Sequence, residues 1–281
     1  MKTLFVSDLD GTLLNRDSAL SPETVRILKR LAGEGMLFTY ATARSFHSAA
    51  VVAEGFTPGV PAVYHNGVIL AEPATGKNLF TAVFTPEQRR EIGELLEKYP
   101  PVPMVFSFID GRERVSWDTC RENEGIQNYL RHRKGDKRLR PLEDGQGLLD
   151  GEIFTLTYIE SRESLEPLHR EFLKRGYTSV VFQQELYREE YWLEIMPDGT
   201  SKAEGIHRLK ELLGCDRVVC FGDALNDLPM FRGADFCFAV ENAAPELRAA
   251  ADGIIGSNQE DGVARWLEAH WREYETGGEN R

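Results

Sequence analysis

The sequence predicts an α/β protein with a doubly wound parallel sheet and an inserted α+β module. Three observations indicate this fold class. Short apolar runs alternate with helical patterns from residue 3 to about residue 80, and the same alternation returns between about residues 203 and 270. From roughly residue 82 to 192 paired strand-like runs replace it, and Asp110-Gly111 between two of them is a hairpin signal. With 281 residues, the chain is long enough for two such domains.

The N-terminal segment has the order strand, helix, strand, helix, strand. A serine N-cap followed by proline, Ser21-Pro22, begins the first helix, and Gly33 and Gly35 end it. The expected strands are residues 4–7, 36–41 and 62–64, and the second helix surrounds residues 49–51. This βαβαβ order is typical of a parallel sheet.

The rest of the chain divides into the inserted module and a second core segment. In the module we expect helices at residues 86–98 and 163–175 and strands at 104–109, 114–117, 153–159, 179–183 and 191–195. Beyond it we expect helices at residues 203–213, 225–231, 245–251 and 263–270, strands at 217–221 and 236–240, and a frayed tail at 276–281. Residues 1–81 and 193–281 would form the core domain, and residues 82–192 the inserted domain.

The composition limits the partners and the compartment. The formal net charge of −12 argues against nucleic acid and membranes as main partners, because nucleic acid and anionic lipid both require a basic surface. No apolar segment approaches the roughly 18 to 20 residues that span a bilayer, and the N-terminus leaves no room for the apolar core of a signal peptide. The 4 cysteines are scattered without a Cys-x-x-Cys pair, so a zinc site is not expected. We expect a cytoplasmic protein, as a monomer or small homo-oligomer.

Two carboxylates, Asp8 and Asp10, follow the first expected strand directly. In open α/β sheets, ligands bind outside the carboxyl ends of the strands. Alternation along an extended chain points Leu9 away and aims Asp8 and Asp10 at a common region. Two acids held together repel each other unless a cation or a proton lies between them. Taken alone, the pair also fits an ordinary polar turn, since Asp and Gly are common turn residues.

Polar residues also follow other expected strands or begin the helices beside them. These are Thr42, Lys202 and the run Gly222-Asp223-Ala224-Leu225-Asn226-Asp227. Magnesium is held by oxygen ligands, usually one or two carboxylates together with water and substrate phosphate. Asp8 and Asp223 would supply such carboxylates. A lysine and a hydroxyl beside them would neutralise and hold a phosphoryl group, which is most of what phosphoryl transfer requires of a protein.

Four motifs together resemble those of the haloacid dehalogenase (HAD) superfamily of phosphatases: Asp8-Leu9-Asp10-Gly11-Thr12, Thr42, Lys202 and Gly222-Asp223-x-x-Asn226-Asp227. The insert before Lys202 resembles the C2 α/β cap of the Cof-type subgroup, subfamily IIB. Asn66-Gly67 and Ser257-Asn258-x-x-x-Gly262-Val263 also resemble that subgroup. The resemblance covers essentially the whole chain. It implies a Rossmann-like core, with residues 82–192 as the cap that selects the substrate.

The resemblance also implies a role for each matching residue. Asp8 would be the nucleophile that forms an aspartyl-phosphate, and Asp10 the general acid/base. Thr42 and Lys202 would bind the transferring phosphoryl group. Asp8, Asp223 and the main-chain carbonyl of Asp10 would hold Mg²⁺. The candidate substrate-binding residues are Thr42, Arg44, Asn66, Lys202 and Asn226, and the candidate metal-binding residues are Asp8, Asp10, Asp223 and Asp227.

Several of these roles have an alternative. Asp227 either takes part at the metal or only supports Lys202, and it also fits an ordinary acid in the first turn of a helix. Arg44 either reaches a substrate phosphate or forms a surface salt bridge. The basic run at residues 131–140 either attracts an anionic substrate or is a solvated loop.

The function we expect is hydrolysis of phosphate monoesters of small metabolites, with Mg²⁺ as cofactor and sugar phosphates as the favoured class. A phosphomutase would use the same aspartyl-phosphate but return the phosphoryl group to the substrate. A phospho-acceptor or sensor module without turnover would also carry an acceptor aspartate, but it would lack the second acid. Asp10 therefore favours turnover over a long-lived phosphorylated state.

Overall fold

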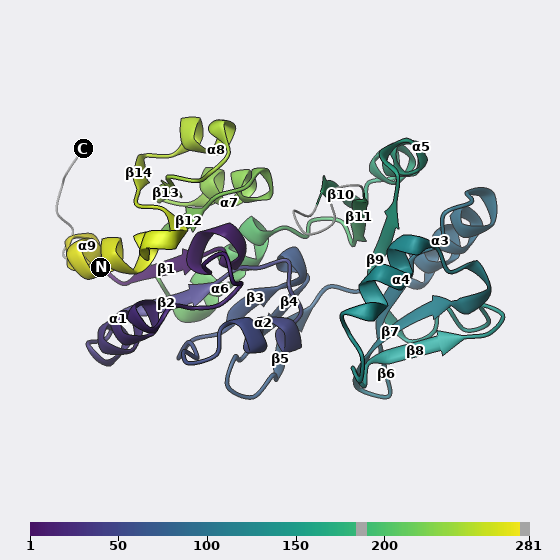
Figure 1. Ribbon diagram of the computed structural model, residues 1–281, viewed down its shortest axis with the longest axis horizontal. Helices are drawn as coiled ribbons and strands as arrows, with labels where there is room; N and C mark the ends of the chain where they lie inside the picture. The colour runs from purple at the N-terminus through teal and green to yellow at the C-terminus, as the bar shows by residue number, and fades with distance from the viewer. Residues whose placement is uncertain (184–189, 276–281) are drawn as a thin grey trace. The chain divides into compact units, whose positions relative to one another are not determined.

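The structure, a computed structural model, describes residues 1–183 and 190–275. The chain divides into two compact units, Met1–Thr81 with Ser201–Arg281, and Ala82–Thr200 (Figure 1). The frayed tail expected at residues 276–281 lies outside the described residues. Within the described ranges, no helix combines the length and the apolar character needed to cross a membrane.

The first unit is built on a five-stranded parallel sheet in the order β14-β13-β12-β1-β2. Its strands are β1 (Thr3–Ser7), β2 (Leu37–Tyr40), β12 (Arg217–Gly222), β13 (Phe236–Val240) and β14 (Gly253–Ile255). β1 is flanked by a strand on each side, and all of its residues are buried. The expected α/β class with a parallel core sheet is confirmed.

Helices pack on this sheet in two groups. α1 (Pro22–Gly33) packs against α9 (Gly262–Glu275), whereas α6 (Lys202–Leu213) packs against α7 (Leu228–Gly233), which packs against α8 (Pro245–Ala250). A further helix, α2 (Phe46–Val52), follows β2. α1 begins as the sequence predicts, because the Ser21 hydroxyl accepts a hydrogen bond from the Thr24 N–H at 2.9 Å.

The third strand of the expected βαβαβ unit is placed differently from the prediction. β3 (Ala62–Tyr64) forms a separate antiparallel sheet with β4 (Ile69–Ala71) and β5 (Asn78–Thr81). It touches the continuation of β2 through a single parallel bridge between Ala41 and Val63. Beyond this bridge, main-chain hydrogen bonds from Thr42 N–H to Val63 and from Asn66 N–H to Thr42 hold the chain after β2 against the β3 segment.

The second unit is built on a six-stranded sheet in the order β10-β11-β9-β6-β7-β8. Its strands are β6 (Met104–Ile109), β7 (Arg112–Asp118), β8 (Leu139–Leu142), β9 (Glu152–Glu160), β10 (Thr178–Gln183) and β11 (Tyr191–Met196). Only the β7–β8 pair is parallel among its described pairs. Asp110 and Gly111, with φ of 51° and 70°, form the predicted tight turn between β6 and β7.

Helices α3 (Pro86–Lys98) and α5 (Arg162–Lys174) supply side chains to the core of the second unit. Ile92 and Leu95 of α3 and Leu168 and Phe172 of α5 belong to one buried cluster with side chains of the sheet. A third helix, α4 (Glu124–Arg131), lies close to β9, since a Cβ on Gly125 would come 2.4 Å from the Ile159 side chain. The module is therefore a mixed sheet with helices, as expected for an α+β insert.

The C-terminal boundary of the insert lies later than residue 192. β11 pairs along its length with β9 and β10, so residues 193–196 belong to the sheet of the second unit. The second unit ends at Thr200, after the turn Pro197-Asp198-Gly199. The second core segment begins at Ser201, eight residues later than the predicted residue 193. The prediction divided β11, whereas the whole strand belongs to the second unit and the boundary follows the turn after it.

Candidate active site

The candidate residues gather at the carboxyl ends of neighbouring parallel strands. Asp8 directly follows β1, Thr42 lies two residues beyond β2, and Asp223 directly follows β12. Because β2 and β12 flank β1, these three strand ends share one edge of the sheet. Lys202 is the first residue of α6 and reaches the same place.

Lys202 joins two buried carboxylates. Its Nζ donates to Oδ1 of Asp8 at 2.5 Å and to Oδ1 of Asp227 at 2.7 Å. All three side chains are almost completely buried. Burial alone lowers the pKa of Lys202, but the charges of Asp227 and Asp8 reverse this effect, and the pKa of the lysine lies above its ordinary value. Lys202 is therefore held as a cation beside Asp8.

Asp227 also organises the turn that carries Asp223. Oδ2 of Asp227 accepts hydrogen bonds from the main-chain N–H groups of Asp223 and Ala224, both at 3.1 Å. Its other oxygen is the one bonded to Lys202. Both carboxylate oxygens of Asp227 are thus engaged by the protein itself, which favours a supporting role over a place at the metal.

Asp223 is fixed by the loop that contains Asp10. Thr12 Oγ1 donates to Oδ1 of Asp223 at 2.7 Å. A Cβ on Gly11 would lie 2.2 Å from Oδ2 of Asp223, and Gly11 has a φ of 77°, so only glycine fits this close approach. The sequence order Asp-x-Asp-Gly-Thr is therefore needed to bring the first loop against the last carboxylate.

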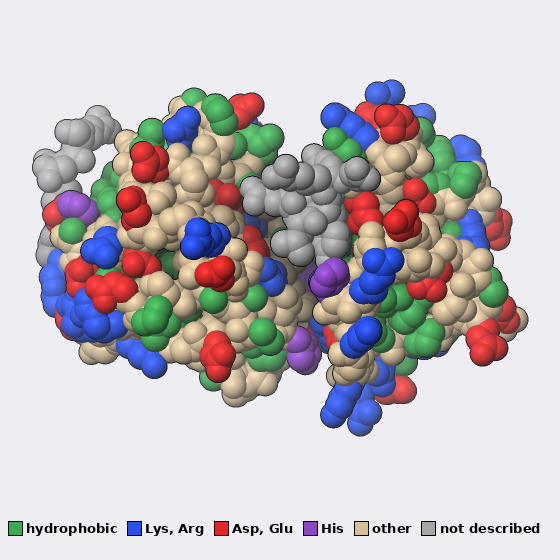
Figure 2. Space-filling model, viewed as in Figure 1, with side chains coloured by type: hydrophobic (Ala, Val, Ile, Leu, Met, Phe, Trp, Pro, Cys, Tyr) green, Lys and Arg blue, Asp and Glu red, His purple; other side chains and the backbone are tan. Residues whose placement is uncertain are grey.

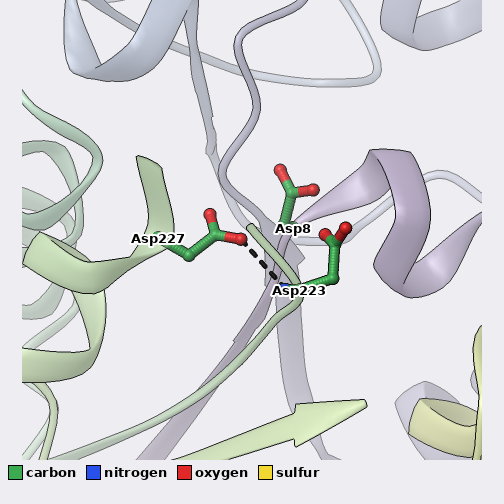
Figure 3. A group of neighbouring side chains, drawn as sticks. All are labelled: Asp8, Asp223 and Asp227. Atoms are coloured by element: carbon green, nitrogen blue, oxygen red, sulfur yellow. Dashed lines mark hydrogen bonds between the residues drawn. The ribbon is translucent and has the colours of Figure 1, made fainter. Parts of the chain in front are cut away.

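The carboxylates of Asp8, Asp223 and Asp227 point toward a common region (Figure 3). One oxygen of each lies within 4.8 Å of the others. Burial raises the pKa of Asp8 well above its ordinary value; Lys202 opposes this, and the neighbouring carboxylates add to it. Burial likewise raises the pKa of Asp223 to about 7, with Thr12 opposing.

This cluster fits a divalent cation. Two buried carboxylates, Asp8 and Asp227, and the partly buried Asp223 lie close to one lysine, so the site carries an excess of negative charge that a cation would relieve. Carboxylate oxygens are the donors that hard cations such as Mg²⁺ prefer. The cluster is a candidate metal centre.

Asp10 lies at the exposed side of the same site. Arg44 binds its carboxylate through two hydrogen bonds, from Nε at 2.7 Å and from Nη2 at 2.6 Å. Two roles were considered for Arg44, contact with a substrate phosphate and a salt bridge. The structure shows a salt bridge. Its partner, however, is the proposed general acid/base rather than an unrelated surface acid.

Thr42 and Asn66 are joined through the main chain. Thr42 is fully buried, its Oγ1 accepts a hydrogen bond from the Arg44 N–H at 3.1 Å, and its carbonyl accepts one from the Asn66 N–H at 3.0 Å. Asn66 has a φ of 53° and is buried. Next to it, a Cβ on Gly67 would lie 1.9 Å from the carbonyl oxygen of Ser201, so this loop packs directly on the residue before Lys202.

Asn226 differs from the other candidates. It lies in the short turn Leu225–Asp227, its side chain is exposed, and no hydrogen bond from that side chain is found within the described residues. The structure therefore brings four of the candidates together: Asp8, Lys202, Asp223 and Asp227. It pairs Asp10 with Arg44 and links Thr42 to Asn66. Asn226 lies outside these contacts.

The basic run at residues 131–140 lies in the second unit, between α4 and β8. Arg138 is paired with Glu113 at 2.7 Å and Asp136 at 2.6 Å, and all three are largely buried. Arg133 lies over an aromatic ring at 3.6 Å. Figure 2 shows Lys and Arg side chains gathered over α4 and the ends of β6–β8. Part of the run therefore stabilises the unit, and attraction of an anionic substrate stays a prediction.

Residues 5–267 match the haloacid dehalogenase-like hydrolase family. The chain belongs to this family. The resemblance to HAD phosphatases of the Cof-type subgroup is confirmed, and the chain is a HAD hydrolase of the phosphatase type.

Relatives of this HAD phosphatase extend over nearly its whole length. The 5-amino-6-(5-phospho-D-ribitylamino)uracil phosphatase YitU of Bacillus subtilis is 25% identical over 271 residues, which cover 95% of this chain and 97% of the relative. The Escherichia coli phosphatase YbjI, named for the same compound, is 24% identical over 264 residues, covering 92% and 93%. The crystal structure of TM0651 from Thermotoga maritima has a TM-score of 0.75 and 28% identity, with 96% and 97% of the two chains covered.

Sequence reasoning missed three residues that hold the site of this HAD phosphatase together. Thr12 bonds Asp223, Asn242 donates to the Gly11 carbonyl at 2.8 Å, and Asn258 donates to the Leu14 carbonyl at 2.8 Å. Thr12 and Asn258 stand inside motifs that were recognised, but no role was given to them. Asn242 follows β13 directly after Glu241, and its place behind a strand of the parallel sheet is the signal that would have found it.

Proposed function

We propose that this protein is a Mg²⁺-dependent phosphatase that hydrolyses phosphate monoesters of small metabolites through an aspartyl-phosphate on Asp8. The observation that carries the proposal is the buried Asp8 carboxylate, bonded by Lys202 at 2.5 Å and placed beside Asp223. One oxygen of Asp8 is bonded to the lysine, and the other is left to attack phosphorus. The reaction class is that of the family.

In the first step an Asp8 oxygen forms a bond to phosphorus while the bond to the leaving oxygen breaks. Asp10 donates a proton to that oxygen, so the alcohol leaves neutral. Lys202 faces the transferring group with positive charge. The Thr42 Oγ1 accepts the Arg44 N–H, so its own hydrogen is available to a phosphoryl oxygen.

In the second step Asp10 takes a proton from a water molecule, whose oxygen attacks phosphorus. The bond between phosphorus and Asp8 breaks, which releases inorganic phosphate and restores the carboxylate. Asp8, Asp223 and the main-chain carbonyl of Asp10 would hold Mg²⁺, with Asp227 supporting Lys202 and the Asp223 turn. When bound, the ion would supply positive charge against the phosphoryl oxygens.

For the substrate we propose sugar phosphates and related polyol phosphates. The support comes from the relatives, whose names describe a phosphorylated ribityl group, a polyhydroxylated carbon chain with a phosphate. We propose that residues 82–192, together with the residues up to Thr200 that belong to the same unit, act as the cap that selects the leaving group.

The test is phosphate release from a panel of sugar, polyol, nucleotide and cofactor phosphates, with Mg²⁺ or with chelator. Asp8→Asn and Asp10→Asn are compared with Asp17→Asn, which changes an exposed aspartate of the same N-terminal segment. We expect Mg²⁺-dependent release that falls at least ~10³-fold in Asp8→Asn, about 4 kcal/mol of transition-state stabilisation, and is unchanged in Asp17→Asn.

Two other outcomes would replace the proposal. Conversion of a substrate to its phosphorylated isomer, with no inorganic phosphate, would identify a phosphomutase. A phosphorylated Asp8 that persists for minutes in the presence of Mg²⁺ would identify an acceptor or sensor module. Activity that survives in Asp8→Asn would remove Asp8 as the nucleophile.

A further inference from the structure

Two asparagines from distant parts of the chain hold the loop at residues 9–14, which carries the proposed acid/base. Asn242 Nδ2 donates to the carbonyl of Gly11, and Asn258 Nδ2 donates to the carbonyl of Leu14, both at 2.8 Å. Each bond joins residues more than 230 positions apart in the sequence. The loop is thus fastened from the far end of the chain.

The main chain of Asn258 also orients the Asn242 side chain. The main-chain N–H of Asn258 donates to Oδ1 of Asn242 at 3.0 Å. This bond fixes which side of the Asn242 amide carries the donor, so Nδ2 faces Gly11. An aspartate at position 242 would keep the acceptor for Asn258 but lose the donor to Gly11. The position therefore requires a side chain with both groups.

The segment that contains Asn242 also contacts the candidate metal centre. The N–H of Ala244 donates to the carbonyl of Asp223 at 2.8 Å. Thr12, in the middle of the loop, donates to the carboxylate of the same aspartate. Residues 242–244 therefore touch both segments that carry site carboxylates, the loop after β1 and the turn after β12.

The turn that carries Asn258 is bonded to helix α1. Asp261, three residues after Asn258, has a φ of 58° and closes the turn before α9. Its Oδ1 accepts hydrogen bonds from Ser21 Oγ at 2.5 Å and Thr24 Oγ1 at 2.9 Å, at the N-terminus of α1. The turn that carries Asn258 is therefore tied to a helix, and the position of its amide does not depend on the loop it holds.

We infer that Asn242 and Asn258 are positioning residues of the active site. They act through the Gly11 and Leu14 carbonyls, and they set the position of the Asp10 loop relative to Asp223. The inference rests on the proposed function for its effect on catalysis. Gly11 has no side chain to restrict its backbone, so the bond to its carbonyl adds to the restraint that its packing against Asp223 provides.

The variants Asn242→Ala, Asn242→Asp and Asn258→Ala test the inference, with Gln259→Ala as the matched control. Gln259 is the exposed neighbour of Asn258, and its side chain makes no hydrogen bond within the described residues. We measure kcat, KM, the unfolding temperature, and Mg²⁺ binding by calorimetry. We expect both alanine variants to lose about 10-fold in kcat and in Mg²⁺ affinity, the range seen when groups that orient metal ligands are removed.

KM and the unfolding temperature should stay near wild type, and Gln259→Ala should match wild type throughout. Asn242→Asp should be impaired as strongly as Asn242→Ala, because the donor is the group that matters. Wild-type kcat and Mg²⁺ affinity in both alanine variants would overturn the inference. A loss of kcat that merely follows a large fall in unfolding temperature would also overturn it, since the role would then be structural.

The calorimetric measurement separates the two proposals. If the wild-type protein releases no phosphate from any substrate, the proposed function fails, while Mg²⁺ binding still reports on the asparagines. Unchanged Mg²⁺ binding in Asn242→Ala would then overturn the inference by itself.

Discussion

Arg44 and Asp10 form a bidentate ion pair in which both carboxylate oxygens accept hydrogen bonds from one guanidinium group. The remaining terminal nitrogen of Arg44 donates to Ser48 Oγ at 2.9 Å, in the first turn of α2. The acid/base of the proposed mechanism is therefore oriented by a residue that follows the neighbouring strand, through the two-bond arrangement in which arginine commonly binds a carboxylate.

Loss of this pair is expected to affect catalysis more than stability. Arg44→Met should lower kcat about 10- to 100-fold, because a carboxylate displaced by about 1 Å no longer meets the leaving oxygen. Arg44→Lys keeps the charge but cannot donate two parallel hydrogen bonds to one carboxylate, so its kcat should lie between those of wild type and Arg44→Met.

A double-mutant cycle decides whether the effect passes through Asp10. In the Asp10→Asn background, Arg44→Met should cause little further loss of kcat. If it lowers kcat by the same factor in both backgrounds, Arg44 acts on the substrate and not on Asp10.

The buried cation Lys202 should be important for stability. Lys202→Met leaves Asp8 and Asp227 buried without their counter-charge, and removing one partner of a buried ion pair costs about 3 to 5 kcal/mol. Lys210→Met is the control, because its pair with Asp235 is partly exposed and should be worth less than about 1 kcal/mol. Both are measured by denaturant unfolding at pH 7. Equal losses in the two variants would contradict the description of Lys202 as a buried cation.

Gly67 should tolerate no side chain, for a reason that Gly35 does not share. Both have φ near 100°, but a Cβ on Gly35 meets no atom within 4 Å, whereas on Gly67 it would meet the Ser201 carbonyl. Gly35→Ala should cost about 1 to 2 kcal/mol from the backbone conformation alone. Gly67→Ala should cost about 1 to 3 kcal/mol more from the clash.

Gly67→Ala should also lower phosphate release, because the displaced residue directly precedes Lys202. The measurements are denaturant unfolding and kcat for both variants. Equal stability of the two alanine variants would show that the chain around Ser201 yields without penalty.

The raised pKa of Asp223, about 7, predicts a pH dependence for metal binding. Below pH 7 a proton competes with the ion for this carboxylate, so Mg²⁺ affinity should fall up to about 10-fold per pH unit as the pH decreases. Calorimetry between pH 5.5 and 8.5 measures this dependence. Affinity that is constant from pH 6 to 8 would contradict it.

The same carboxylate should affect the stability of the metal-free protein in the opposite direction. Between pH 4 and 7 the folded state binds more protons at Asp223 than the unfolded state, so the free energy of unfolding falls as the pH rises through this window. Asp223→Asn should weaken this slope and should also remove stabilisation by Mg²⁺. Urea unfolding from pH 4 to 8, with and without Mg²⁺, checks both effects.

Local sequence signals predicted most elements of the fold. β6 and α3 have the predicted bounds, since a polar turn or a capping residue marks their ends; Thr85 and Gln88, for instance, form a capping box on α3. β14 and α4 were missed because one has only three residues and the other merges into the basic run. The predicted place of β3 in the parallel sheet was wrong, because a three-residue apolar run has the same pattern in a parallel and in an antiparallel sheet.

The candidate site was predictable where its residues stand inside motifs. Asp8, Lys202 and Asp223 each lie at a strand end or helix start that the apolar pattern marks. The contact between Arg44 and Asp10 was left open, because the sequence does not tell which of several acids a strand-end arginine will meet. The place of Asn242 after a strand could have marked it as a candidate, but its bond to Gly11 was not predictable, since that bond spans 231 positions and depends on the sheet order β13-β12-β1.

The chain leaves the first unit after Thr81 and re-enters it at Ser201, one residue before Lys202. Every group of the proposed mechanism thus lies outside the inserted segment, and the packing of Gly67 against Ser201 fixes the point of re-entry. Recombination or mutation can therefore exchange, shorten or enlarge the insert without rebuilding the reacting groups. If the insert selects the leaving group, as proposed, then selection on specificity is separated from selection on the chemistry, and a new specificity requires changes in only one contiguous segment of the gene.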